Sequence, residues 1–314
     1  MSSKSRPNIV FIMSDDHAVS AVSAYEDWLA ELAPTPNLDR IADNGMLMTR
    51  TFNTNSICGP SRASILSGNY PDRVGVPGVI RQFEDNDWGN LSNDFVSLPD
   101  ALKKSGYKTA LIGKWHLGLD SPDIPNERGF DFFKGFLGDM MDDYNHHLRG
   151  GVNWMRENDT EINPKGHATD LFTQWSVDYI NENKNSKNPF FLFLNYNAPH
   201  SPIQPPKNWL NLVKNREKKA DLNRQKLIAF IEHLDNSIEK VLVSLEKNNL
   251  IDNTVIIFTS DNGGALYYSA SNKPLNGGKG NMMEGGIRVP CIVKWQSVVK
   301  PGIVKEPIML MDFY

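Results

Sequence analysis

The chain has 314 residues, of which 40% are hydrophobic and 22% are charged. This composition is typical of a globular protein with a sizeable core, and it excludes wholesale disorder. With 33 Lys and Arg against 37 Asp and Glu, the net charge at pH 7 is -4, which argues against a nucleic-acid partner. No apolar run reaches the roughly 18 residues that a membrane span needs, so we expect no membrane partner.

The N-terminus lacks the pattern of a secretory signal. Residues 1–7 are polar and basic, and the first apolar stretch, residues 9–13, has only the length of a strand. No apolar region of signal-peptide length and no small-residue cleavage site follows it. We therefore expect a cytoplasmic protein for the sequence as written, or a periplasmic or secreted protein if a signal segment has been removed.

Strand and helix patterns alternate along the chain. Short continuous apolar runs predict strands buried on both faces, and Ser, Thr and Pro before amphipathic turns predict helix starts. In chain order, the expected elements are a strand over 9–13, a helix over 35–45, a helix over 97–106, a strand over 108–112, a strand over 190–194, a helix over 221–249, a strand over 254–259 and a strand over 289–293. Residues 204–219 are interpreted as a polar surface segment. The alternation predicts an α/β fold with a large, mainly parallel or mixed central sheet flanked by helices.

Polar clusters follow four of these strands directly. They are Asp15–Asp16, Lys114–His116, Asn197–His200 and Asp261–Asn262. Because ligands bind at the carboxyl edge of open α/β sheets, we expect these clusters to form one polar rim.

The acidic members of this rim predict a cation site. Asp15, Asp16, Asp261 and Asn262 offer only oxygen ligands, which suit Ca²⁺ or Mg²⁺ better than Zn²⁺. One Asp pair after a strand is more often a turn or a helix cap, but two pairs at corresponding strand ends favour a metal.

Cys58 is a candidate nucleophile. It precedes residues 63–68, which have the pattern of a helix start, and a helix N-terminus with Arg62 nearby favours an activated thiolate. A buried cysteine in a turn is the alternative. Cys291 lies in the apolar run 289–293 and fits that buried role.

Several cationic or imidazole side chains accompany this nucleophile. They are Arg62, Lys114, His116, His200 and Lys279. Lys279 lies in the glycine-rich segment 276–280, which lacks P-loop spacing, and taken alone it is interpreted as a solvated loop charge. A hard cation and converging positive groups around one nucleophile suit sulfuryl or phosphoryl transfer.

Seven motifs in order resemble the type I sulfatases of the alkaline-phosphatase-like superfamily. They are Cys58-x-Pro60-Ser61-Arg62 and the segments 7–17, 35–39, 113–118, 198–200, 260–263 and 277–280. The resemblance implies a sulfatase catalytic domain with the alkaline-phosphatase-like fold over residues 7–314. Since family members are usually longer, we expect their C-terminal subdomain, a small antiparallel sheet with a packing helix, to be missing here.

The resemblance also implies a cofactor arrangement. Cys58 would be oxidised to formylglycine by a formylglycine-generating or maturase enzyme and then hydrated to a diol. One Ca²⁺ would be bound by Asp15, Asp16, Asp261, Asn262 and the modified Cys58.

The remaining roles follow the same resemblance. Arg62 would stabilise the diol, one diol oxygen would attack sulfur, and Lys114 and Lys279 would hold the sulfate oxygens. His200, with Lys279, would protonate the leaving oxygen. His116 would deprotonate the second hydroxyl, so that sulfate leaves and the aldehyde is restored.

The implied activity is that of a sulfuric ester hydrolase acting on a sulfated small molecule or glycan. Two alternatives stay open: a phosphonate monoester or phosphodiester hydrolase with the same formylglycine machinery, and an inactive fragment that binds sulfated ligands. The polar segment 139–147 is interpreted as a substrate-facing loop, a second metal site or a solvated loop. Trp88, Trp154 and Trp209 are candidate sugar platforms or packing residues, whereas His233 and Asp235 are interpreted as structural.

Overall fold

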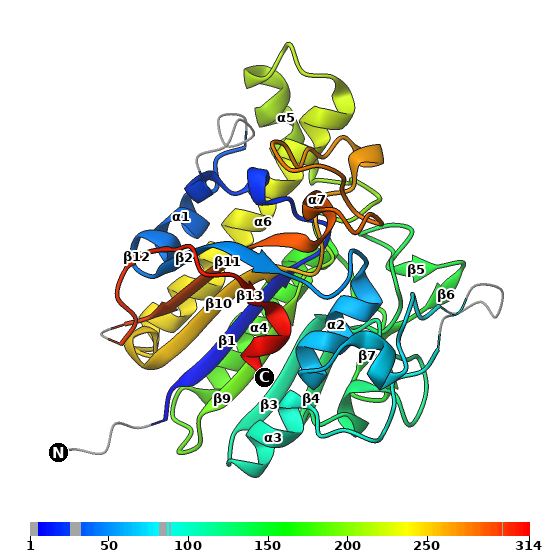
Figure 1. Ribbon diagram of the computed structural model, residues 1–314, viewed down its shortest axis with the longest axis vertical. Coiled ribbons are helices and arrows are strands. Elements are labelled where there is room, and N and C mark those ends of the chain that lie inside the picture. Colours follow the sequence, from blue (N-terminus) through cyan, green and yellow to red (C-terminus); the bar gives the residue numbers. More distant parts are fainter. Residues whose placement is uncertain (1–5, 26–32, 82–86, 88, 297) are drawn as a thin grey trace.

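An eleven-stranded mixed sheet runs through the molecule and has helices on both faces (Figure 1). The computed structural model describes residues 6–25, 33–81, 87, 89–296 and 298–314. The strand order is β12-β2-β11-β10-β1-β9-β3-β4-β7-β8, and β13 also pairs with β2. No described helix is long and apolar enough to cross a membrane.

The sheet is built from strands of two to eight residues, and two further strands form a separate hairpin. The sheet strands are β1 (Asn8–Ser14), β2 (Met46–Phe52), β3 (Lys108–Lys114), β4 (Phe132–Phe136), β7 (Met155–Glu157), β8 (Thr160–Glu161), β9 (Phe190–Asn195), β10 (Thr254–Ser260), β11 (Arg288–Trp295), β12 (Gly302–Val304) and β13 (Ile308–Met309). The hairpin strands are β5 (Leu148–Arg149) and β6 (Val152–Asn153). The α-helices are α1 (Pro36–Asp43), α2 (Cys58–Ser67), α3 (Leu98–Lys104), α4 (Ala168–Asn183), α5 (Lys207–Arg216), α6 (Leu222–Lys247) and α7 (Glu284–Ile287).

The centre of the sheet is parallel, as predicted. Strands β10, β1, β9, β3 and β4 pair side by side in parallel, whereas β11 is antiparallel to both β10 and β2. The carboxyl ends of the five parallel strands therefore share one edge of the sheet. Gly113 allows β3 and β9 to approach closely there, because a Cβ atom at this position would lie 1.9 Å from the carbonyl oxygen of Asn195.

Two apolar cores cover the two faces of the sheet. In β1, Val10 and Ile12 pack into the core beneath α1, α4 and α6, whereas Phe11 and Met13 pack into the core with α2. Successive side chains of a strand point to opposite faces, so a strand covered on both sides reads as one continuous apolar run. This is why the sequence revealed the central strands clearly.

The prediction of a surface segment over residues 204–219 was wrong in part, because α5 occupies its middle. This helix is largely exposed, and only Val213 is fully buried. Val213, with the partly buried Trp209 and Leu210, belongs to a small third core that includes Leu227 and Ile228 of α6. The apolar stripe of α5 is too short to be recognised as a helix in a sequence segment that is otherwise polar. The strands β2 and β4 and the helix α4 were also not predicted from the sequence.

The start of α1 depends on a distant residue. The helix begins after Thr35, as predicted, but the Thr35 side chain makes no capping hydrogen bond. Instead, Asp235 of α6 accepts hydrogen bonds from the backbone N–H groups of Asn37 at 3.1 Å and Leu38 at 2.9 Å. A carboxylate at a helix N-terminus satisfies donors that have no partner within the helix. Asp235 therefore has a structural role, as predicted.

Substitution Asp235→Ala should lower the free energy of unfolding by about 1–3 kcal/mol, because it leaves buried N–H groups without an acceptor. Urea unfolding followed by circular dichroism measures the change. The exposed Asp252 provides the control, and Asp252→Ala should stay within about 0.5 kcal/mol of the parent. Equal effects of the two substitutions would remove the capping role.

Candidate functional site

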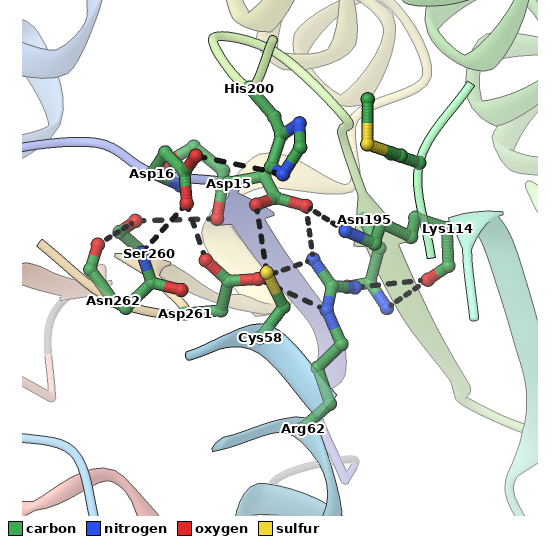
Figure 2. Close-up of polar contacts among 12 residues, drawn as sticks. Asp15, Asp16, Cys58, Arg62, Lys114, Asn195, His200, Ser260, Asp261 and Asn262 are labelled. Atoms are coloured by element: carbon green, nitrogen blue, oxygen red, sulfur yellow. Dashed lines mark hydrogen bonds and ion pairs between the residues drawn. The ribbon is translucent and has the colours of Figure 1, made fainter. Parts of the chain in front are cut away.

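The predicted polar clusters meet at the carboxyl edge of the parallel strands (Figure 2). Asp15 and Asp16 follow β1, Lys114 ends β3, His200 follows β9, and Asp261 and Asn262 follow β10. All six side chains are buried. Cys58, the first residue of α2, lies against them, with its Sγ 3.5 Å from Oδ1 of Asp15.

Arg62, one helical turn beyond Cys58, joins the ends of three strands. Its Nη2 lies 3.1 Å from Oδ2 of Asp15 and 2.8 Å from Oδ2 of Asp261, and its side chain is 1% exposed. Nη1 also donates to the carbonyl oxygen of Lys114 at 3.1 Å. The planar guanidinium thus uses several donors at once, and this geometry fixes the ends of β1, β3 and β10 relative to α2.

The two carboxylates that share Arg62 differ in their electrostatics. Burial opposes ionisation of Asp15, but Lys114, whose Nζ lies 2.5 Å away, and other positive groups outweigh burial and lower its pKa. Burial and the negative charge of Asp15 raise the pKa of Asp261 to about 6. A further positive charge at this position would favour the ionised form of both groups.

Asp16 organises the opposite side of the site. Its backbone is left-handed, with φ of 61°, which is uncommon for a residue with a side chain. Its carboxylate accepts hydrogen bonds from Nδ2 of Asn262 at 2.8 Å and Nζ of Lys279 at 2.9 Å. Nε2 of His200 lies 3.7 Å from Oδ2 of the same group.

The oxygen-rich side of the site fits a hard cation. Oδ1 of Asn262 is buried and has no hydrogen-bond partner among the described residues. A buried polar atom without a partner is costly, and a metal ion would satisfy it. Ligand atoms of Asp15, Asp16, Cys58 and His200 also lie within 4.8 Å of one another. Carboxylate and amide oxygens are the ligands that Ca²⁺ prefers in proteins.

The surroundings of Cys58 disfavour a thiolate. Burial and the adjacent negative charge of Asp15 raise the pKa of the thiol, so it stays protonated. The raised pKa disfavours a reactive thiolate and favours the alternative that the sequence left open, a buried cysteine.

The two histidines of the site are held in defined orientations. Nε2 of His116 is 3.1 Å from the carbonyl oxygen of Ile80, whereas its buried Nδ1 has no partner among the described residues. Burial and the charge of Lys114 hold the pKa of His116 well below its ordinary value. His200 places Nδ1 2.7 Å from the carbonyl oxygen of Ser201, and burial and Lys279 lower its pKa.

A cavity of about 370 Å³ opens above these groups. Cys58, His116, His200 and Lys279 line it, whereas Lys114 and Arg62 lie beneath and bind carboxylates. These four residues present one thiol, two imidazoles and one ammonium group to a bound molecule. The positive charges of Lys279 and of Arg81, which also lines the cavity, suit an anion. We call this space the anion cavity.

Other lining residues were not singled out from the sequence. They are Ile57, Val79, Arg81, Ser201, Tyr267 and Tyr268. Asp139 and Met140 also line the cavity, so the interpretation of segment 139–147 as a loop that faces the site agrees with the structure. Asn195, which donates to the carbonyl oxygen of Lys114 at 3.0 Å, was missed too, although a polar residue at the end of an apolar strand could have drawn attention to it.

Comparison with known proteins identifies the family. The family model named Sulfatase matches residues 7–314. The chain belongs to the sulfatase family. Arylsulfatase J of Mus musculus is 33% identical over 99% of this chain and 52% of its own length. N-acetylgalactosamine-6-sulfatase of Rattus norvegicus is 31% identical over 98% of this chain and 60% of its own length. The chain thus spans only 52–60% of these two sulfatases.

Solved structures share the fold. The crystal structure of Ps i-CgsB in complex with k-i-k-neocarrahexaose is 31% identical, with a TM-score of 0.89 over 98% of this chain and 70% of that one. The phosphonate monoester hydrolase of Agrobacterium radiobacter also has the fold, with a TM-score of 0.65 at 18% identity. The alkaline-phosphatase-like architecture is therefore confirmed, but fold alone does not separate sulfate from phosphorus ester chemistry.

Substitution Arg62→Ala should lower the free energy of unfolding by about 3–5 kcal/mol, because two buried carboxylates lose their shared cation. Chemical unfolding measures this loss. The control is Arg40→Ala, since the Arg40–Glu246 pair is 41% and 42% exposed and should contribute less than about 1 kcal/mol. A small effect at Arg62 would contradict its bridging role.

Proposed function

We propose that the protein hydrolyses a sulfate monoester on a sulfated carbohydrate, with a nucleophile derived from Cys58. The position of Cys58 carries this proposal. It lines the anion cavity, begins α2 and lies beside the buried carboxylates, and its segment has the Cys-x-Pro-Ser-Arg pattern within a sulfatase-family chain. Residues 7–314 would form the catalytic domain.

Two groups absent from the bare polypeptide complete the proposed chemistry. Formylglycine made from Cys58 by a formylglycine-generating or maturase enzyme would supply a hydrated aldehyde as nucleophile, and Ca²⁺ would supply positive charge for the sulfate oxygens. The oxygens of Asp15, Asp16, Asp261 and Asn262 would hold the cation. Since the thiol of Cys58 stays protonated, its conversion to an oxygen nucleophile also explains how this position becomes reactive.

Lys279 would bind the sulfate group electrostatically. Burial disfavours its charged form, but the negative charge of Asp16, with a contribution from Asp15, outweighs burial and raises the pKa of Lys279 well above its ordinary value. The ammonium group therefore stays charged at the cavity wall. Lys114 is buried against Asp15, so its positive charge would act on the sulfate from beneath the cavity.

His200 and His116 would move protons at different atoms. With Nδ1 of His200 held by the carbonyl oxygen of Ser201, Nε2 is free to carry the proton for the leaving alcohol. A bound anionic ester would favour the charged imidazolium and so oppose the lowering of its pKa. His116 would act as a base through Nδ1, because Nε2 donates to the carbonyl oxygen of Ile80.

The names of the relatives support a carbohydrate substrate. One relative is an N-acetylgalactosamine-6-sulfatase, and Ps i-CgsB was crystallised with an oligosaccharide, k-i-k-neocarrahexaose. Hydrolysis of 4-nitrophenyl sulfate and of bis(4-nitrophenyl) phosphate tests the reaction class directly. Faster cleavage of the sulfate supports the proposal, whereas preference for the phosphodiester favours the phosphorus ester hydrolase. If protein with converted Cys58 cleaves neither ester and also releases no sulfate from sulfated oligosaccharides, both candidate functions are contradicted.

Substitution Cys58→Ala should abolish sulfate release, because no formylglycine can form. In protein co-expressed with a maturation enzyme, mass spectrometry should find the peptide of residue 58 about 18 Da lighter, as H₂S is lost and one oxygen is gained. Cys291→Ala is the matched control, since this cysteine is also buried but lies in β11, and it should keep both conversion and turnover. Sulfate release by Cys58→Ala would refute the nucleophile.

Substitution Asn262→Ala should weaken Ca²⁺ binding by roughly tenfold or more, because it removes the buried oxygen that lacks a partner. Calorimetric titration with Ca²⁺ and the Ca²⁺-induced shift in melting temperature measure binding without reference to activity. Asn44→Ala, on the exposed end of α1, serves as control. Unchanged affinity in Asn262→Ala would remove this residue from the ligand set.

A further inference from the structure

A second cavity adjoins the anion cavity. Its volume is about 560 Å³, within the range of pockets that bind small molecules. Four residues line both cavities, namely Met140, Ser201, Tyr267 and Tyr268. A molecule with one group in the anion cavity can therefore extend past these shared residues into the second cavity.

Two tyrosines stand where the cavities meet. Tyr267 is 68% exposed and Tyr268 is 40% exposed, and their ring centroids lie 4.8 Å apart with an interplanar angle of 60°. Exposed aromatic rings in a cleft offer a rigid apolar surface with a hydrogen-bonding hydroxyl, at a low cost in side-chain entropy. The C–H face of a pyranose ring is complementary to such a surface.

The tyrosines lie on a segment that is held in place. The side chain of Asn272 bonds both the N–H and the carbonyl oxygen of Gly264, each at 2.9 Å. On the other side of the pair, Arg224 of α6 donates to the carbonyl oxygen of Ser269 at 2.6 Å. The backbone that carries the rings is thus held in place, which lowers the entropic cost of binding a ligand.

One positive side chain lines the second cavity but not the anion cavity. This side chain is Lys226 of α6, which is partly exposed and forms no ion pair with any described residue. Asn223 and Gln204 add amide groups. Asp142 also lines the cavity, but its carboxylate is paired with Arg149 at 3.0 Å. The cavity therefore suits a polar molecule with a negative group.

The tryptophans do not provide this surface in the described structure. Trp154 packs against both main cores, and Trp209 packs against the third core and lies 6.0 Å from His233 between ring centroids. Trp88 lies outside the described residues. The aromatic rings at the mouth of the anion cavity are those of Tyr267 and Tyr268.

We propose that the second cavity is a subsite for the neighbouring sugar residue of a multiply sulfated oligosaccharide, with the sugar ring against Tyr267 and a second sulfate at Lys226. This inference rests on the proposed function and narrows it: the substrate is an oligosaccharide chain rather than a sulfated monosaccharide or a simple aryl sulfate. One sulfate enters the anion cavity at Lys279, and the adjoining residue contributes binding energy through the cleft.

Binding of oligosaccharides of different length tests the subsite. The probes are the disaccharide and the hexasaccharide of chondroitin 6-sulfate, and neocarrabiose and neocarrahexaose sulfates. Calorimetry uses the Cys58→Ala protein with Ca²⁺, so that binding is measured without turnover. In at least one series the hexasaccharide should bind about tenfold more tightly than the disaccharide. Equal affinity of short and long probes in both series, including absence of binding, overturns the inference.

Variants locate the effect within the cleft. The length preference is the ratio of the affinity for the hexasaccharide to the affinity for the disaccharide. Tyr267→Ala and Lys226→Ala should each reduce this ratio by roughly three- to tenfold. Lys226→Ala should also make the affinity for the hexasaccharide less dependent on salt concentration. The controls are Tyr70→Ala and Lys104→Ala, which remove an exposed tyrosine and an exposed lysine outside the cleft. Melting temperatures verify that each variant is folded. A length preference that survives both cleft substitutions also overturns the inference.

The two proposals fail in different ways. Turnover of 4-nitrophenyl sulfate by the converted protein without any length preference in binding contradicts the subsite and leaves the sulfatase proposal intact. A length preference that depends on Tyr267 and Lys226, in a protein that releases no sulfate, supports the subsite as a binding site and contradicts the sulfatase proposal.

Discussion

The shared ion pair of Arg62 with Asp15 and Asp261 is the interaction on which the site depends. It ties α2 to the ends of β1 and β10, which are neighbouring parallel strands. Cys58 and Arg62 are four residues apart on one helix, so they lie on the same helical face. When the guanidinium binds the two carboxylates, the sulfur of Cys58 is held next to Asp15.

Such a cluster is expensive to build inside a protein. Three carboxylates face three cations in it, and all six side chains are largely removed from water. Replacement of buried ion pairs by apolar groups is often neutral or stabilising, so stability alone does not explain the cluster. The left-handed backbones of Asp16 and His116 add strain at the same place. Charge and strain concentrated at the edge of a sheet are typical of a site that binds a ligand.

Much of the molecule could be predicted from its sequence because the strong patterns have local causes. Central strands covered on both faces need continuous apolar runs, and the polar residues that follow them must meet at one edge. Features with long-range causes were not predictable. The cap of α1 comes from Asp235, almost 200 residues away, and His116 is oriented by a backbone carbonyl at Ile80, which leaves no mark on residue type. Tyr267 and Tyr268 become part of a cleft only when α6 and segment 139–147 close around them.

Anomalous diffraction from crystals grown with Ca²⁺ tests the central claim most directly, namely that Arg62 holds Asp15 and Asp261 so that position 58 lies at a cation site facing the anion cavity. The account predicts one anomalous peak surrounded by oxygens of Asp15, Asp16, Asp261 and Asn262, with residue 58 beside it. Full occupancy by Ca²⁺ at another place in the chain, with these four residues unligated, would contradict it.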